Sequence, residues 1–175
     1  MAKRIVLGVT GSIAAYKACD IARRLMENGC QVFVAMTPPA AKLVTPTTFA
    51  ALTGNAVYAD MWDDNAWNMT HIDLAKTADV MLIAPATANT IAKVAHGFAE
   101  DPVSSLALAT RAKKIIAPAM NEGMFENSFV QENLARLTKQ GVEIISPVKG
   151  NLACGDVGVG HLADVDVIVN AVLKG

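Results

Sequence analysis

Short runs rich in valine, isoleucine and leucine alternate with amphipathic segments along this 175-residue chain. Continuous apolar runs are typical of strands buried on both faces of a sheet, and the segments between them carry apolar residues at helical spacing. Parallel strands need such crossovers, so the alternation predicts an α/β fold, a doubly wound parallel sheet in a single domain of residues 1–175. The expected strands are Arg4–Val9, Gln31–Met36, Asp79–Ala84, Lys113–Ala117 and Val142–Ile145, and the expected helices are Ile13–Asn28, Asn89–His96, Asp101–Thr110, Phe129–Gln140 and Asp164–Leu173.

The composition limits the kinds of partner. The sequence is 53% hydrophobic with a formal net charge of −1 at pH 7, so it lacks the basic surface that nucleic acids and anionic lipids require. Only 18% of residues are charged, a balance that favours burial of some surface between subunits. No segment has the apolar length that a membrane span needs. We therefore expect small molecules and further copies of the chain as partners.

The three cysteines are far apart, so they support neither a disulfide framework nor a metal site, and a reducing cytoplasm fits them best. Cys19 and Cys30 lie in apolar segments and are expected in the core. Cys154 lies instead in the glycine-rich segment Lys149–His161. Because glycine weakens helices and strands, this segment is expected to be a mobile flap without stable secondary structure. A thiol in such a flap is a candidate for chemistry.

Ligands of a parallel α/β sheet bind at the carboxyl ends of its strands, so the loops there form the candidate site. After the first strand, Gly11 and Ser12 open a helix whose free N–H groups favour a phosphate; an ordinary turn capped by Ser12 is the alternative. The dinucleotide fingerprint and the nucleoside-triphosphate loop are both incomplete here. The second strand ends in Thr37 without the carboxylate that binds an adenosine ribose, which disfavours NAD. Thr37 offers its hydroxyl to a phosphate or a sugar-alcohol chain.

The third and fourth strands end in similar loops. One is Pro85–Thr90, which brings Asn89 to a helix start, and the other begins at Pro118 and contains Asn121. Helix capping by Asn89 or Thr90 and turn formation by Asn121 are the alternative roles. Two Pro-Ala-x-Asn-type loops at neighbouring strand ends are hard to attribute to turns alone, so both are candidate binding loops.

The chain resembles the homo-oligomeric flavin-containing cysteine decarboxylases. The resemblance rests on motifs in the order typical of that family: Gly11–Lys17, Pro85–Thr90, Pro118–Phe125 and Ala153–Gly160. It implies a Rossmann-like FMN domain that assembles as a homotrimer or a homododecamer, with the flavin between subunits. It also implies a possible partner, a phosphopantothenate–cysteine ligase on a separate or fused domain.

The resemblance assigns roles residue by residue. It makes His71 the acceptor of the substrate's thiol proton and Cys154 the donor of a proton late in the reaction. It makes Asn121 the residue that binds the substrate carboxylate, and it places Ala119 and Met120 beside the substrate. The residues that it assigns to the cofactor are Gly11, Ser12, Ile13, Thr37, Phe49, Thr87, Ala88, Asn89 and Thr90.

The implied reaction is decarboxylation of 4′-phosphopantothenoylcysteine to 4′-phosphopantetheine in coenzyme A biosynthesis. Loss of CO₂ from an N-acylcysteine leaves electrons without an acceptor, so oxidation of the thiol carbon to a thioaldehyde must come first. Reduction of the resulting enethiol completes the reaction. The alternatives are a peptidyl-cysteine decarboxylase, which stops at the enethiol and does not need Cys154, a non-catalytic flavin-binding regulatory subunit, and a relative of the flavin prenyltransferases.

The chain differs from the family pattern at two positions. The asparagine motif ends in Phe125 where the family has tryptophan, which keeps an aromatic wall. The flap continues with His161 where the family usually has arginine, and histidine pairs with an anion only when it is protonated.

Overall fold

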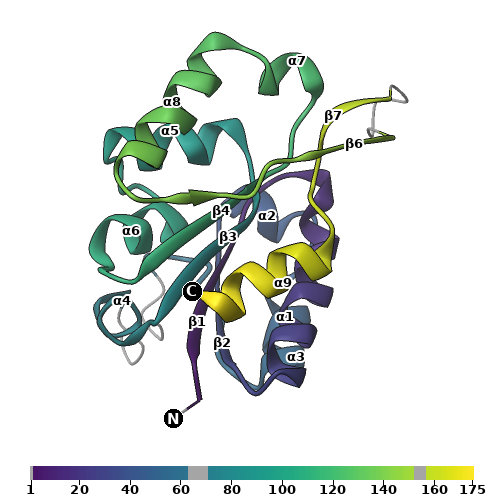
Figure 1. Cartoon of the computed structure of the whole chain (residues 1–175). Coiled ribbons are helices and arrows are strands. Elements are labelled where there is room, and N and C mark those ends of the chain that lie inside the picture. Colours follow the sequence, from purple (N-terminus) through teal and green to yellow (C-terminus); the bar gives the residue numbers. More distant parts are fainter. Residues whose placement is uncertain (1, 63–70, 152–156) are drawn as a thin grey trace.

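The computed structural model describes residues 2–62, 71–151 and 157–175. Its main sheet has five parallel strands in the order β2–β1–β3–β4–β5 (Figure 1). They are β1 (Arg4–Val9), β2 (Gln31–Met36), β3 (Val80–Ala86), β4 (Lys113–Pro118) and β5 (Glu143–Ile144). Since β1 has β2 on one side and β3 on the other, the strand order reverses between β1 and β3. The predicted doubly wound parallel sheet is confirmed, with its switch point at the ends of these two strands.

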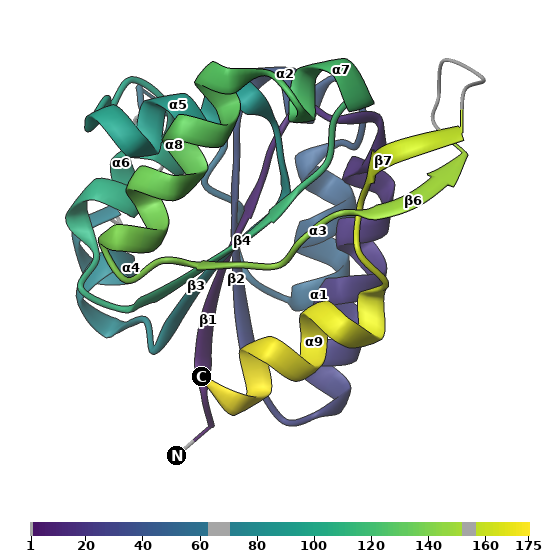
Figure 2. The ribbon, with the colours of Figure 1, turned by 45° about the horizontal axis from the view of Figure 1, so that its top comes forward.

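Helices cover both faces of this sheet (Figures 1 and 2). One face packs against α1 (Lys17–Glu27), α3 (Pro46–Thr53) and α9 (Val165–Lys174), and the other against α4 (His71–Thr77), α5 (Ala88–His96), α6 (Pro102–Ala109) and α8 (Ser128–Lys139). Side chains alternate along β1, so that Ile5 and Leu7 enter the first apolar cluster and Val6 the second. This burial on both faces explains why the strands are continuous apolar runs in the sequence.

The other described elements are η1 (Ile13–Tyr16), α2 (Pro38–Ala41), α7 (Glu122–Phe125), β6 (Val148–Asn151) and β7 (Val157–His161). The helix expected over Ile13–Asn28 is a 3₁₀ turn, η1, followed by α1. Its predicted stop is confirmed, because Gly29 takes a φ of 79° that favours glycine. Across the part of the chain that the structure describes, no helix is long and apolar enough to cross a bilayer.

The glycine-rich segment departs from the prediction. Lys149–His161 was expected to lack strands, and this is wrong at both of its ends, where β6 and β7 pair as a two-stranded antiparallel sheet. The hairpin projects from the main body near α7 (Figures 1 and 2). Glycine has a weak preference for strands, so this hairpin depends on its cross-strand hydrogen bonds and on its contacts with α7. Cys154 lies outside the described residues.

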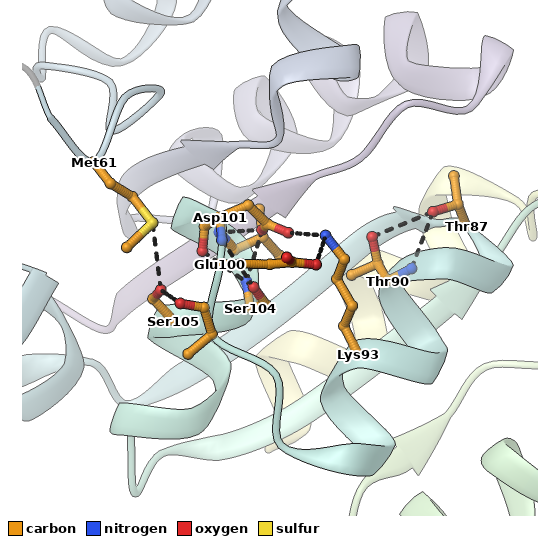
Figure 3. Close-up of polar contacts among 10 residues, drawn as sticks. Met61, Thr87, Thr90, Lys93, Glu100, Asp101, Ser104 and Ser105 are labelled. Atoms are coloured by element: carbon orange, nitrogen blue, oxygen red, sulfur yellow. Dashed lines mark hydrogen bonds and ion pairs between the residues drawn. The ribbon is translucent and has the colours of Figure 1, made fainter.

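A buried carboxylate fixes the junction between α5 and α6 (Figure 3). Asp101 is 5% exposed, and its Oδ1 accepts hydrogen bonds from the backbone N–H groups of Val103 (3.1 Å) and Ser104 (3.0 Å). Its Oδ2 accepts one from Nζ of Lys93 at 2.9 Å, and Glu100 also pairs with this lysine at 2.9 Å. Partial burial alone would lower the pKa of Lys93, but the hydrogen bonds and charges of both carboxylates outweigh burial and raise the pKa. Asp101 therefore caps α6 and ties it to α5.

We predict that Asp101→Ala lowers the free energy of unfolding by about 2–3 kcal/mol, because it removes a helix cap and one partner of the half-buried Lys93. Urea denaturation measures this loss. The matched control is Glu27→Ala, which removes a carboxylate from the exposed Arg23–Glu27 pair and should leave the midpoint unchanged within error. Equal destabilisation by the two variants would contradict the role given to Asp101.

Candidate active site

A buried hydroxyl joins the loops that follow β1 and β3. Thr10 is fully buried, and its Oγ1 donates a hydrogen bond to the backbone oxygen of Pro85 at 2.6 Å. The same Oγ1 accepts a hydrogen bond from the backbone N–H of Thr87 at 3.0 Å. Both loops are therefore held in one arrangement at the switch point of the sheet, where α/β folds bind their ligands.

A cleft of about 540 Å³ opens at this edge of the sheet. Its walls come from the loops after β1, β3 and β4, from the first turns of η1 and α1, and from the end of β7. Most of the lining is apolar, and the polar side chains among the lining residues belong to Ser12, Tyr16, Lys17, Thr87, Asn121 and His161. An apolar cleft with a few converging polar groups has the character of a small-molecule site.

In the turn after β1, Ser12 caps η1 and Gly11 lies close to Pro39 of α2. Ser12 is the N-cap of η1, and its Oγ accepts a long hydrogen bond from the backbone N–H of Ala14 at 3.4 Å, so the capping alternative holds for this serine. A Cβ added to Gly11 would lie 2.6 Å from Cβ of Pro39, so a side chain there would displace α2. Gly11, Ser12 and Ile13 all line the cleft, and their assignment to the cofactor stays a prediction.

Thr37 carries a buried polar atom that lacks a partner. Its backbone N–H donates to the oxygen of Val9 at 3.0 Å, which places it beside the end of β1. The residue is 6% exposed, and its Oγ1 has no hydrogen-bond partner among the described residues. A buried unpaired hydroxyl costs about 1–3 kcal/mol, and a ligand oxygen can remove that cost. Thr37 does not itself line the cleft.

The loop after β3 is organised by Thr87. As the N-cap of α5, its Oγ1 accepts from the backbone N–H of Thr90 at 3.3 Å and donates to Oγ1 of Thr90 at 3.2 Å (Figure 3). The cap is therefore neither Asn89 nor Thr90. Of the predicted residues in this loop, Thr87 lines the cleft, Thr90 is buried at 2% exposure and Asn89 is exposed. Phe49 is fully buried in the core in α3, and its assignment to the cofactor stays a prediction.

The loop after β4 brings the predicted substrate residues into the cleft. Ala119, Met120 and Asn121 all line it. Asn121 is also the N-cap of α7, where its Oδ1 accepts from the backbone N–H of Gly123 at 2.9 Å. Turn formation and a place in the cleft are therefore compatible for this asparagine, because the cap fixes its side chain at the rim.

Main-chain contacts dock β7 against this loop. The backbone N–H of Met120 donates to the oxygen of Gly160 at 3.0 Å, and the N–H of Val159 donates to Oε1 of Glu122 at 2.7 Å. A Cβ on Gly160, whose φ is 148°, would lie 2.2 Å from the oxygen of Met120, and a Cβ on Gly158 would lie 2.6 Å from the Glu122 carboxyl. These glycines permit the close approach. Sequence reasoning missed Glu122, because its partner lies far along the chain.

The structure describes neither predicted catalytic side chain, that of His71 or that of Cys154. His71 is the first residue of α4, but its side chain lies outside the described part. Cys154 is also outside. Burial raises the pKa of the other two thiols, Cys19 and Cys30, which keeps them protonated and unreactive at neutral pH. Among the residues described, no group of His, Cys, Asp and Glu side chains could hold a metal ion.

Comparisons with known proteins agree on one family. A family model described as Flavoprotein matches residues 1–175. A probable phosphopantothenoylcysteine decarboxylase of Streptococcus mutans is 48% identical, with 98% of each chain covered. The coenzyme A biosynthesis bifunctional protein CoaBC of Vibrio vulnificus is 47% identical over 93% of this chain, which spans 41% of that longer protein.

Solved structures agree with these relatives. A cysteine-to-serine mutant of PPC decarboxylase, complexed with pantothenoylaminoethenethiol, has a TM-score of 0.90 at 30% identity, with 99% of this chain and 98% of the other covered. The FMN-dependent cysteine decarboxylase SpaF has a TM-score of 0.82 at 32% identity and covers 98% of this chain and 96% of its own.

We predict that Gly160→Ala undocks β7, because the added Cβ collides with the Met120 oxygen. Hydrogen exchange followed by mass spectrometry should then show lost protection at the Met120 and Val159 amides. Gly141→Ala is the matched control, since Gly141 also has a positive φ of 82° but a Cβ added there would meet no atom within 4 Å. The control should cost about 1 kcal/mol of stability from backbone strain and keep both amides protected. Retained protection in Gly160→Ala would refute this docking.

Proposed function

Because the chain belongs to the Flavoprotein family, we propose that it is an FMN-dependent decarboxylase that converts 4′-phosphopantothenoylcysteine into 4′-phosphopantetheine in coenzyme A biosynthesis. The observation that carries the proposal is the cleft at the switch point. It brings the Ser12 turn, the Thr87 loop and the Asn121 loop together in a chain whose fold matches a PPC decarboxylase along almost its whole length.

The residues present fit FMN. The turn at Gly11–Ile13 suits a terminal phosphate, and the orphaned hydroxyl of Thr37 gains a partner from a phosphate or a sugar-alcohol oxygen. The apolar lining suits the flat ring. The loop that follows β2 begins Thr37-Pro38 without a carboxylate for an adenosine ribose, which favours a mononucleotide. When bound there, FMN supplies a hydride acceptor, which the side chains themselves lack.

The side chains then handle protons and orientation. His71 accepts the proton of the substrate thiol as the thiol carbon is oxidised to a thioaldehyde. Asn121 holds the substrate carboxylate through its amide until CO₂ leaves, and the electrons of the broken C–C bond convert the thioaldehyde into an enethiolate, which takes up one proton to give the enethiol. Cys154 supplies the proton when the enethiol is reduced to phosphopantetheine, and the hydride removed in the first step is returned. The net change is loss of CO₂ with no net oxidation.

The assembly is proposed as a homotrimer or a homododecamer. Ile13, Tyr16 and Met124 line the cleft yet remain 63%, 62% and 49% exposed, an apolar rim suited to burial by another copy. In both views, α4 lies on the opposite side of the molecule from the β6–β7 hairpin (Figures 1 and 2). A neighbouring copy would therefore be needed to bring its α4, with His71, to this cleft. The bifunctional relatives support a ligase as a further partner, on a separate or fused domain.

We expect the purified protein to carry FMN rather than FAD or NAD, and to convert phosphopantothenoylcysteine into phosphopantetheine. Cofactor release followed by chromatography identifies the flavin, and product mass identifies the reaction. Turnover of cysteine-terminated peptides in place of phosphopantothenoylcysteine would assign the chain to the peptidyl branch. Recovery mainly of FAD would contradict the cofactor assignment, and bound FMN without turnover of either substrate would point to a regulatory subunit.

We predict that Cys154→Ser still releases CO₂ but accumulates the enethiol, because a serine hydroxyl is a far weaker acid than a thiol. Mass spectrometry should find a product lighter than phosphopantetheine by the mass of H₂. Cys19→Ser is the matched control: this thiol is half-buried in α1, so the variant should make phosphopantetheine at close to the parent rate. Phosphopantetheine formation at the parent rate by Cys154→Ser would remove this cysteine as the proton donor.

A further inference from the structure

A lysine and a histidine from distant parts of the chain meet in the cleft, and the proposed mechanism uses neither. Lys17 begins α1, and His161 ends β7. Nζ of Lys17 lies 3.4 Å from Nε2 of His161, and both residues line the cleft. The contact joins segments that are 144 residues apart, so it depends on the docked position of β7.

The contacts of the imidazole define its tautomer. Nδ1 of His161 lies 2.9 Å from the backbone oxygen of Leu162, which can only accept, so Nδ1 carries the proton. The Lys17 ammonium can only donate, so Nε2 is the acceptor. With Nε2 facing the ammonium, the imidazole orients Lys17 rather than binding an anion itself. Gly150 of β6 leaves room for the ring, since a Cβ there would lie 3.2 Å from its Cγ.

The charge on Lys17 is not balanced by its surroundings. Among the described residues, no carboxylate lies within ion-pair distance of its Nζ, and the described lining of the cleft contains no Asp or Glu. Lys93, another half-buried lysine of the fold, differs because it pairs with two carboxylates. A half-buried ammonium without a counter-ion, facing a cleft with apolar walls, favours an anionic ligand.

We infer that Lys17, oriented by His161, binds the phosphate monoester of the substrate. Lys17 is then a specificity residue for this substrate, and the inference rests on the proposed function. The substrate has two anionic groups, a carboxylate and a phosphate. In the proposed mechanism Asn121 binds the carboxylate, so the phosphate still needs a partner. An ammonium with one N–H on Nε2 of His161 keeps further N–H groups for phosphate oxygens. FMN is the other source of a phosphate monoester, but its phosphate is assigned to the Gly11–Ser12 turn and Thr37. His161 is a positioning residue that acts through Lys17.

The test compares phosphopantothenoylcysteine with pantothenoylcysteine, which lacks the phosphate. Lys17→Met keeps the aliphatic stem and removes the charge, so KM for the phosphorylated substrate should rise roughly 10- to 100-fold while KM for the other and both kcat values stay close to the parent values. Lys17→Arg should restore most of the discrimination. Lys42→Met, which removes a lysine outside the cleft, is the matched control and should change neither KM.

Two substitutions at His161 test whether Lys17 needs the acceptor atom that His161 provides. His161→Leu removes the acceptor and should raise KM for the phosphorylated substrate about fivefold, with no effect on the unphosphorylated one. His161→Gln keeps an acceptor oxygen and should restore binding. A purely structural role for His161 would instead move both KM values together and would overturn its positioning role.

Binding measurements separate this inference from the proposed function. Calorimetry should show that the parent protein binds phosphopantetheine more tightly than pantetheine, and that Lys17→Met removes the difference while keeping its flavin. In the parent protein, added salt should weaken binding of phosphopantetheine and leave pantetheine unaffected, a test that no variant's folding can disturb. Loss of FMN in Lys17→Met would assign the lysine to the cofactor phosphate and overturn the inference. Equal losses for both ligands, or none, would also overturn it, whereas failure of the parent to turn over either substrate would count against the proposed function alone.

Discussion

The buried hydroxyl of Thr10 is the contact on which the candidate site depends. The sheet reverses its strand order between β1 and β3, so the chain leaves β1 toward α1 on one face and β3 toward α5 on the other. Thr10 joins the two loops by donating to Pro85 and accepting from Thr87, and each bond contributes roughly 0.5–1.5 kcal/mol. Their larger effect is geometric. The turn that contains Ser12 and the loop capped by Thr87 become two walls of one cleft.

The third wall is held by the main chain. The backbone N–H of Met120 donates to the backbone oxygen of Gly160, and the backbone N–H of Val159 donates to the Glu122 carboxylate, so β7 and the loop after β4 form one unit. Glycine at position 160 is a steric requirement of this contact, and a side chain at position 158 would displace the Glu122 carboxyl. The same docking brings His161 to Lys17 and completes a cleft with apolar walls and one unbalanced ammonium among its described residues. Backbone geometry therefore sets the electrostatics of the site.

The sequence predicts the features that depend on local pattern. The parallel strands are continuous apolar runs because both faces of the sheet are buried, and topology places the loops after β1, β3 and β4 at one edge. Contacts between distant segments leave no local signal. The β6–β7 hairpin, the Glu122 contact and the Lys17–His161 pair all depend on such contacts. The short helices α2 and α3 were also missed, because only a proline in the first turn marks each start.

Flavin absorbance during a single anaerobic turnover shows whether the chain oxidises its substrate before CO₂ leaves. Phosphopantothenoylcysteine is mixed rapidly with the FMN-loaded protein, and the visible flavin band and CO₂ release are followed together. If oxidation comes first, the flavin band bleaches no later than CO₂ appears and recovers as phosphopantetheine forms. CO₂ release from a protein whose flavin stays oxidised throughout, with formation of no reduced intermediate, would contradict this order of steps.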